Sequence, residues 1–433
     1  MTKLDEGGFN RIFLITMRDG FQMIACIPYP VTVPKFYAVA SEIAMIYFLH
    51  AKGLSVPQVY DYSSTPDNTA KTEYIFMEFV TGTKLSNIWM ELEGAEVALV
   101  VHQMVELEAR IMLIPFLAGG SLYYANNLQK AAGRMTGVPM PLNDECFCIG
   151  PDVRLPMWYG RRSQLDVDRG PCTSRSLKFP ELIEIYHIDK NTEAALVAAI
   201  CKEAAYLERF GRLLLPFQRK QREVYGYEEQ LPLDHIKNLE LYHRMTPSLV
   251  PGKASLHAFC MRHPDFQPSN VIVSTSPGSG CWRIIGLLDW QHTMVLSHFL
   301  LASIPGRLQN YGNLGSQTLK THDLKALLVK ATEKWAELAG ADVPCPVKFE
   351  PDDVSKTKVF SERLWLSDRN FTGCQTIVGF ETETWVPNEH YKRGKALAEL
   401  LKLTVLKEVP AGEARDKAEA NWFLDNMNED NYM

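Results

Sequence analysis

The most informative segment of this chain reads Met261-Arg262-His263-Pro264-Asp265-Phe266-Gln267-Pro268-Ser269-Asn270-Val271-Ile272-Val273. It contains the spacing His-x-Asp-x-x-x-x-Asn, and Asn270 leads directly into a β-branched run that predicts a strand. A Ser-Pro-Gly-Ser-Gly turn follows at residues 276–280, and a second predicted strand ends on Asp289. The pattern therefore predicts that a loop and a hairpin bring Asp265, Asn270 and Asp289 together.

These residue types suit phosphoryl transfer, which requires positioned metal ions, neutralised phosphate charge and an aligned acceptor hydroxyl. Asp265 is the predicted base, which accepts or orients the acceptor's proton. Asn270 and Asp289 are the predicted ligands of Mg²⁺, a cation that prefers oxygen atoms and is usually held by one or two carboxylates plus phosphates. We expect His263 to support Asp265 rather than to transfer a proton. The alternative is that His263 and Asp265 cap a loop and Asp289 ends a strand.

The first 80 residues predict a small α+β lobe. Two β-branched or apolar runs at residues 11–17 and 21–28 flank Asp19-Gly20, which is a hairpin turn signal. Pro34 then opens a predicted helix that ends near Gly53. Two further strands are predicted at residues 56–62 and 74–80, so the order is strand, strand, helix, strand, strand.

The remainder of the chain predicts mainly helices. Residues 81–318 form the expected larger lobe, with a long insertion at about 125–260 whose first part, 125–190, is rich in Gly, Pro, Asp and Arg and reads as irregular. Residues 319–433 form an expected helical extension with an acidic tail. Amphipathic patterns predict individual helices at residues 95–112, 192–210, 233–243, 322–338 and 390–406.

Composition excludes several classes of protein. The formal net charge of −6, with 22% charged residues, argues against a dedicated nucleic-acid binder, which usually carries a basic field. No apolar run reaches the 18 or so residues of a membrane span. The nine cysteines form no C-x-x-C pair, which predicts reduced thiols in an intracellular compartment. The first residues resemble neither a signal peptide nor a transit peptide.

Several stretches together resemble the fungal aminoglycoside-phosphotransferase-like family, specifically its "altered inheritance of mitochondria" branch. Besides the segment quoted above, they are Glu6-Gly7-Gly8-Phe9-Asn10-Arg11, Ile27-Pro28-Tyr29-Pro30, residues 72–79, 120–124, 287–292 and 385–391. The resemblance implies a two-lobed protein-kinase-like fold with a helical C-terminal extension and with ATP in the cleft. It further implies an ATP- and Mg²⁺-dependent phosphotransferase that acts on an unknown small-molecule hydroxyl, and residence in mitochondria.

The resemblance also implies residues that bind the nucleotide. Gly7 and Gly8, with Asn10, correspond to the loop over the phosphates, where the lack of a Cβ lets the backbone approach them. Glu42 corresponds to the family's helix glutamate, which pairs with a cation on a strand.

Residues 77–80, Met77-Glu78-Phe79-Val80, correspond to the hinge between the lobes. The backbone C=O of Glu78 and N–H of Val80 are the expected partners of adenine, beside Met77.

Two features depart from the family pattern. Cys26 stands where a strand Lys or Arg should neutralise phosphate charge, so Glu42 loses its partner; Lys3 and Lys35 are not at the right strand position. This leaves open a catalytically impaired, nucleotide-binding pseudokinase or scaffold. Relative to the family pattern, the chain is also expected to be shortened within the first strand and near Leu319. A protein kinase is disfavoured because Trp290 and Gln291, not Phe-Gly, follow Asp289.

A stretch that mixes aromatic and charged residues, from Met157 to Arg169, has two readings. It either lines the acceptor pocket or is an insertion that packs on the large lobe.

Overall fold

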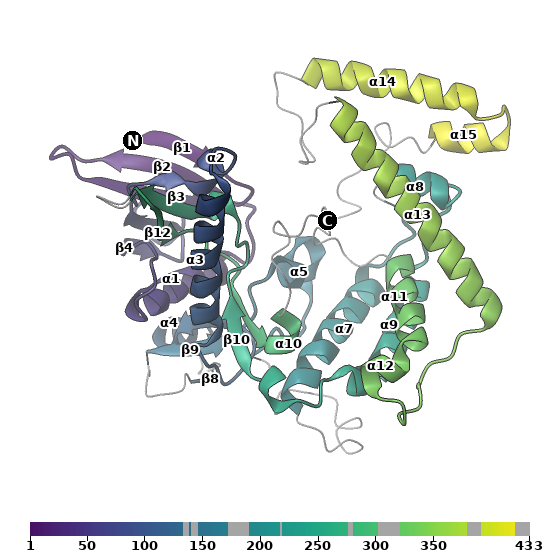
Figure 1. Ribbon diagram of the computed structural model, residues 1–433, viewed down its shortest axis with the longest axis horizontal. Coiled ribbons are helices and arrows are strands. Elements are labelled where there is room, and N and C mark those ends of the chain that lie inside the picture. Colours follow the sequence, from purple (N-terminus) through teal and green to yellow (C-terminus); the bar gives the residue numbers. More distant parts are fainter. Residues whose placement is uncertain are drawn as a thin grey trace. The chain divides into compact units, whose positions relative to one another are not determined.

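The computed structural model describes residues 1–132, 138–139, 146–171, 190–216, 219–275, 280–301, 321–378 and 391–420. Contacts divide the chain into two compact units, of which the first comprises residues 1–202 and 250–316 and the second residues 203–249 and 317–433. Every predicted site residue belongs to the first unit. The expected mixture of a strand-rich lobe and helical remainder is confirmed (Figure 1).

A five-stranded antiparallel sheet forms the small lobe (Figure 1). Its order is β1 (Thr2–Glu6), β2 (Asn10–Thr16), β3 (Gln22–Pro28), β5 (Tyr74–Glu78) and β4 (Val59–Ser63). The turn between β2 and β3 closes with Gly20 N donating to Met17 O over 3.1 Å, and Gly20 has a φ of +91°. Glycine is favoured there because residues with a Cβ rarely adopt that conformation. The Asp-Gly signal thus predicted the hairpin correctly.

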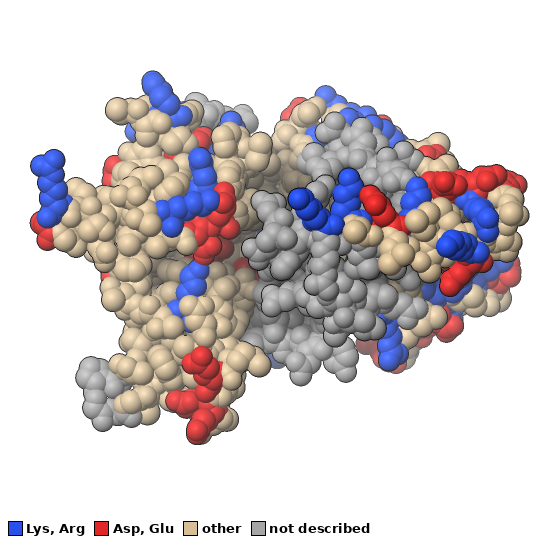
Figure 2. Space-filling model, turned by 90° about the horizontal axis from the view of Figure 1, so that it is seen from above, with Lys and Arg blue, Asp and Glu red and all other residues tan. Residues whose placement is uncertain are grey.

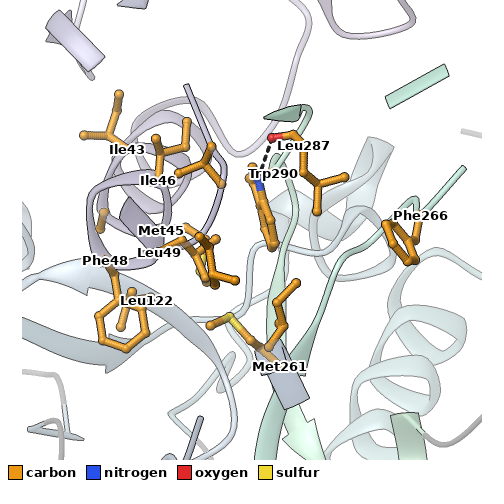
Figure 3. Close-up of a cluster of buried hydrophobic side chains, with 14 of the residues drawn as sticks. Ile43, Met45, Ile46, Phe48, Leu49, Leu122, Met261, Phe266, Leu287 and Trp290 are labelled. Atoms are coloured by element: carbon orange, nitrogen blue, oxygen red, sulfur yellow. Dashed lines mark hydrogen bonds between the residues drawn. The ribbon is translucent and has the colours of Figure 1, made fainter. Parts of the chain in front are cut away.

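Helix α1 (Lys35–Ala51) lies in the centre of the first unit and packs on β4, β5 and β7 (Ser121–Tyr124). The helix is buried along most of its length, as expected for an element that is apolar on several faces. In Figure 3 its side chains point toward Leu122, Met261 and Trp290, which come from three other segments. Replacing a fully buried phenylalanine such as Phe48 by alanine costs about 3–5 kcal/mol.

The connection after β5 enters a second sheet, of order β12-β11-β6. Its strands are β6 (Thr83–Lys84), β11 (Val271–Thr275) and β12 (Trp282–Leu287). Gly82 is required by close approach, because an added Cβ would lie 2.6 Å from Ile272 Cγ2 and 2.8 Å from Val273 O. The chain continues through α2 (Leu85–Ile88) into α3 (Gly94–Met112), which packs on β12.

Two further sheets lie in the first unit, and two of their strands, β8 and β9, fall in the stretch 125–190 that was predicted as irregular. One has the order β7-β9-β8, and the other pairs β10 with β13. These elements and their neighbouring helices are β8 (Val138–Pro139), β9 (Phe147–Gly150), β10 (Phe259–Arg262), β13 (Met294–Ser297), α4 (Ala125–Ala132), α5 (Leu155–Trp158) and α10 (His298–Leu301). All four residues of β9 are buried, so the prediction of an irregular stretch was wrong here. Such short strands carry no readable alternation, and their pairing with β7 fixes them.

The second unit is helical in its described parts. Helix α9 packs on α11, and α13 packs on α8 and α11. Its helices are α8 (Arg219–Val224), α9 (Pro232–Leu249), α11 (Thr321–Glu333), α12 (Trp335–Ala339), α13 (Pro351–Val378), α14 (Tyr391–Glu408) and α15 (Glu413–Ala420), while α7 (Lys190–Phe210) spans the division between the units. Helix α13 was not predicted, and the helix predicted at 322–338 is interrupted at Lys334. The region near Leu319 lies outside the described residues.

The molecular surface gives little indication of a charged partner. On the face drawn in Figure 2, acidic and basic side chains of the described residues are interspersed among uncharged ones. The expectation of no nucleic-acid partner stays a prediction. Among the helices that the structure describes, none combines the length and the apolar character needed to cross a bilayer.

Candidate active site

His263 holds the predicted catalytic loop through both of its ring nitrogens. The imidazole is 5% exposed, its Nε2 donates to Leu288 O over 2.8 Å, and its Nδ1 accepts from the backbone N–H of Asp265 over 3.1 Å. Burial lowers the pKa of His263 to about 4, so the ring is neutral near pH 7. These contacts agree with the predicted supporting role, since neither nitrogen faces a substrate.

Asp265 and Asn270 are joined by hydrogen bonds within the loop. Asn270 Nδ2 donates to the backbone O of Asp265 over 2.9 Å and to its Oδ2 over 3.2 Å. In this orientation Oδ1 is the amide atom that the predicted role as a metal ligand would use. Gln267 Nε2 also donates to Asp265 Oδ2. Sequence reasoning missed Gln267, although it stands inside the quoted motif two residues after Asp265.

Asp289 follows the second strand of the hairpin and lies near the same loop. Leu288 N donates to Asn270 O over 2.8 Å, so Asp289 follows directly on a residue bonded to the loop. Asp289 has a φ of +64°, a left-handed conformation that non-glycine residues seldom adopt. Burial, and then the charge of Asp265, raises the pKa of Asp289 to about 6. The structure therefore brings together the three residues that the sequence predicted as neighbours.

Trp290 anchors this turn in the core. Its side chain is 1% exposed, and Nε1 donates to Leu287 O over 3.1 Å, which Figure 3 marks with a dashed line. The indole ring meets the His263 ring edge-on at a centroid distance of 4.5 Å. The buried tryptophan thus fixes both the hairpin end and the histidine that supports the loop.

Glu42 and Cys26 form a buried acidic neighbourhood with Asp289. Glu42, on α1, is 6% exposed, and Cys26, on β3, is 4% exposed. Burial, and then the charge of Asp289, raises the pKa of Glu42 to about 8. Burial, followed by the charges of Glu42 and Asp289, raises the pKa of the Cys26 thiol well above its usual value. A neutral thiol thus stands beside two carboxyl groups, at the strand position where the family places a cation.

The Gly7–Gly8 turn between β1 and β2 lies over the residues that follow Asp289. Gly7 N donates to Asn10 O over 3.0 Å, and Asn10 Nδ2 donates to Gln291 Oε1 over 2.9 Å. A Cβ on Gly8 would meet no atom within 4 Å, so internal packing does not require glycine there. The predicted phosphate loop and the predicted metal ligands therefore lie close together.

The predicted hinge residues connect the two lobes. Glu78 N donates to Gln58 O over 2.7 Å, and Met77 packs against the main core. Val80 lies against β12, because an added Cβ on Gly286 would stand 3.1 Å from Val80 Cγ1. The contacts of Glu78 and Val80 with adenine stay a prediction.

The family follows from a comparison with known protein families. Residues 2–296 match the model of the phosphotransferase enzyme family. The chain belongs to this family. The match spans the small lobe, the catalytic loop and the hairpin, and it confirms the two-lobed kinase-like fold that the resemblance implied.

The relatives of this phosphotransferase-family chain include fungal proteins. It is 33% identical over 319 residues to a subtelomeric hrmA-associated cluster protein of Aspergillus fumigatus, with 70% of this chain and 60% of the relative covered. It is 28% identical over 390 residues to the mitochondrial "altered inheritance of mitochondria protein 9" of Debaryomyces hansenii, with 86% and 56% covered. The predicted branch is confirmed. The chain spans about 60% or less of the length of these relatives.

A solved structure with lower similarity is that of a thermostable mutant of aminoglycoside phosphotransferase APH(4)-Ia, in complex with AMP-PNP and hygromycin B. It is 14% identical to this phosphotransferase-family chain, with 69% of this chain and 68% of that chain covered. The TM-score of 0.33 is too low to support an argument about the site.

The segment that mixes aromatic and charged residues is held by packing in this member of the family. Arg169 places its guanidinium 4.1 Å from the ring centroid of Trp158, and Tyr37 of α1 stacks on that tryptophan at 5.5 Å. Arg169 also donates to Arg162 O over 2.7 Å. These contacts favour the reading as a packed insertion, and the insertion contacts α1 of the small lobe.

Proposed function

We propose that this chain is an ATP- and Mg²⁺-dependent phosphotransferase that moves the γ-phosphoryl group to a hydroxyl of a small molecule. The proposal is carried by the convergence of Asp265, Asn270 and Asp289. Asn270 bonds Asp265 Oδ2 over 3.2 Å, and its backbone O accepts from Leu288, the neighbour of Asp289, over 2.8 Å.

Asp265 is the proposed base. The amide nitrogens of Gln267 and Asn270 both donate to its Oδ2, which orients the carboxylate and leaves Oδ1 to accept the proton of the substrate hydroxyl. His263 bonds the backbone N–H of Asp265 and the backbone O of Leu288, the residue before Asp289, and so ties the loop to the hairpin. Positioning of this kind supplies much of the rate acceleration in phosphoryl transfer.

Asn270 Oδ1 and the carboxylate of Asp289 are the proposed protein ligands of Mg²⁺. Both are oxygen donors, which fits a hard cation. Among the described residues, no three His, Cys, Asp or Glu side chains are grouped closely enough to hold an ion by themselves. The cation would therefore share its ligands with the nucleotide, whose phosphate charge it would neutralise.

The nucleotide would lie between the Gly7–Gly8 turn and the catalytic loop, with adenine at Glu78 and Val80. The contact between Asn10 and Gln291 supports this location, because it places the turn over the segment that follows Asp289.

A second candidate function is nucleotide binding without phosphoryl transfer. The specific observation that favours it is Cys26, which leaves Glu42 without a cationic partner on β3. Removing a cation of this kind from a phosphate site lowers rates by orders of magnitude when nothing replaces it.

A transfer assay with γ-labelled ATP distinguishes the two functions. Purified protein is incubated with Mg-ATP and a library of small molecules that carry hydroxyl groups, and Asp265→Asn serves as the control. The proposal predicts label on at least one acceptor with the wild type and none with the variant. ATP binding without any transfer would support the second candidate, and absence of ATP binding would contradict both.

We also infer a mitochondrial location, because relatives of the "altered inheritance of mitochondria" group carry that location in their names. Microscopy of a tagged protein from its full coding region tests this, and a signal outside mitochondria would contradict it.

A further inference from the structure

We propose that Lys84 supplies the nucleotide's phosphates with the positive charge that β3 lacks at Cys26, and that Lys84 leaves Asp5 to do so. This inference rests on the proposed function, since it assumes that ATP occupies the cleft. It assigns a new phosphate-binding residue to this chain.

Asp5 lies on the same face of the small-lobe sheet as Cys26. In the register of that sheet, Asp5 of β1 is opposite Ile12 of β2, and Ile12 is opposite Cys26 of β3. Residues directly opposite one another on neighbouring strands share a face. Besides burial, the charges of Glu42 and Asp289 raise the pKa of the Cys26 thiol, so this shared face is the one turned toward the proposed metal ligand Asp289.

Lys84 lies in the sheet that carries the catalytic hairpin. It is the second residue of β6 and pairs with Ile272 of β11. Ile272 comes two residues after Asn270, which corresponds to about 7 Å along a strand. The tight contact of Gly82 with Ile272 and Val273 holds β6 against β11, so the backbone of Lys84 has a fixed position near the catalytic loop.

The two side chains meet in an ion pair between the lobes. Lys84 Nζ lies 2.6 Å from Asp5 Oδ2, and the side chains are 41% and 55% exposed. The hydrogen bond from Lys84 is the largest cause that lowers the pKa of Asp5. Ion pairs with this exposure contribute little to stability. A triphosphate carries more negative charge than one carboxylate, so exchange of the partner is favourable.

Other cations of the small lobe are engaged elsewhere. Lys3 bonds Glu6, and Glu6 also accepts from the hydroxyl of Tyr29. The guanidinium of Arg11 lies 5.5 Å from the ring centroid of the same tyrosine. Arg11 is directly opposite Glu6 in the sheet and one residue out of phase with Ile12, so Arg11 and Glu6 lie on the face opposite to that of Asp5 and Cys26.

Calorimetric titration with Mg-ATP and with adenosine tests the assignment. Lys84→Met should weaken Mg-ATP binding about tenfold while adenosine binding changes less than about twofold. Asp5→Asn should tighten Mg-ATP binding, because it frees the ammonium. Lys84→Arg should retain affinity. Lys52→Met is the matched control, because Lys52 is an exposed lysine of the same lobe at the C-terminal end of α1 and its replacement should leave both affinities unchanged.

A double variant distinguishes a phosphate-binding role of Lys84 from a purely structural one, because a structural role would not depend on the residue at position 26. In the Cys26→Arg background a cation is restored on β3, so Lys84→Met should weaken Mg-ATP binding less than about threefold. Thermal unfolding of each variant checks that it is folded.

The outcomes separate this inference from the function on which it rests. A wild type that does not bind Mg-ATP overturns both. A wild type that binds, with Lys84→Met either equal to it or weakened equally toward ATP and adenosine, overturns only the phosphate role of Lys84.

Discussion

The carboxyl groups of Glu42 and Asp289 share one buried neighbourhood, and the charge of Asp289 is a cause of the raised pKa of Glu42. Glu42 belongs to a helix, and Asp289 follows β12, 247 positions later in the chain. The thiol of Cys26 lies near both, and it cannot neutralise either. The absence of a cation on β3 is therefore a property of the folded site and has measurable consequences.

The first consequence concerns stability. The folded pKa of Glu42, about 8, exceeds its ordinary value of 4.5, so the protonated form is favoured by folding. The contribution of the protonated Glu42 carboxyl to the free energy of unfolding is fully present below about pH 4.5 and is lost as pH rises through 8. Glu42→Gln should therefore raise the free energy of unfolding at pH 8 by on the order of 2–3 kcal/mol and have little effect at pH 4.5.

Urea denaturation at both pH values measures this effect, with the exposed Glu91→Gln as the control. Equal stabilities of wild type and Glu42→Gln at pH 8 would contradict the buried, unpaired state of Glu42.

The second consequence concerns the missing cation. Cys26→Arg places a guanidinium beside Glu42 and Asp289 and should raise both Mg-ATP affinity and any transfer rate, by about tenfold or more. Cys26→Ser keeps a small neutral side chain and should leave both unchanged. The gain should be largest in the Lys84→Met background, where Lys84 no longer supplies positive charge. Equal rates of Lys84→Met with and without Cys26→Arg would show that a cation on β3 is unimportant.

A third prediction concerns His263. His263→Ala removes one bond to Leu288 O and one from Asp265 N–H, which should lower the free energy of unfolding by about 2 kcal/mol. Activity should fall through kcat because Asp265 is no longer held. The exposed His50→Ala is the control. A histidine that transferred protons would instead impose its own limb on the pH profile near its ordinary pKa. A limb that remains in Asp289→Asn and disappears in His263→Ala would refute the supporting role.

A fourth prediction concerns pH and the metal. Asp289 has a pKa of about 6 because it is buried and lies near the charge of Asp265, and a proton on Asp289 competes with Mg²⁺. Mg-ATP affinity should be constant above pH 7 and should fall up to about tenfold per pH unit below 6. Titrations at pH 5.0, 6.0 and 7.5 check this, and a flat profile would exclude Asp289 as a ligand.

The sequence predicted the catalytic loop well because the spacing of His263, Asp265 and Asn270 encodes a local geometry. All three residues lie within one short loop, and the following strands carry clear β-branched runs. The small lobe was predicted equally well, because the alternation of apolar and polar residues and the Asp19-Gly20 turn are also local signals.

The features that sequence reasoning missed depend on distant contacts. Strand β9 is defined by its pairing with β7, and Asp5 meets Lys84, 79 residues away. The bond between Asn10 and Gln291 spans 281 residues. No local pattern encodes such pairs, because the two partners lie far apart in the sequence.

The central claim is that Asp265, Asn270 and Asp289 serve one nucleotide-bound Mg²⁺. Calorimetric titration of ATP into wild type and Asp289→Ala, each with Mg²⁺ and with EDTA, tests it most directly. The account predicts that Mg²⁺ strongly increases the affinity of the wild type for ATP and has no effect on the variant. An equal response of the two proteins to Mg²⁺ would contradict the account.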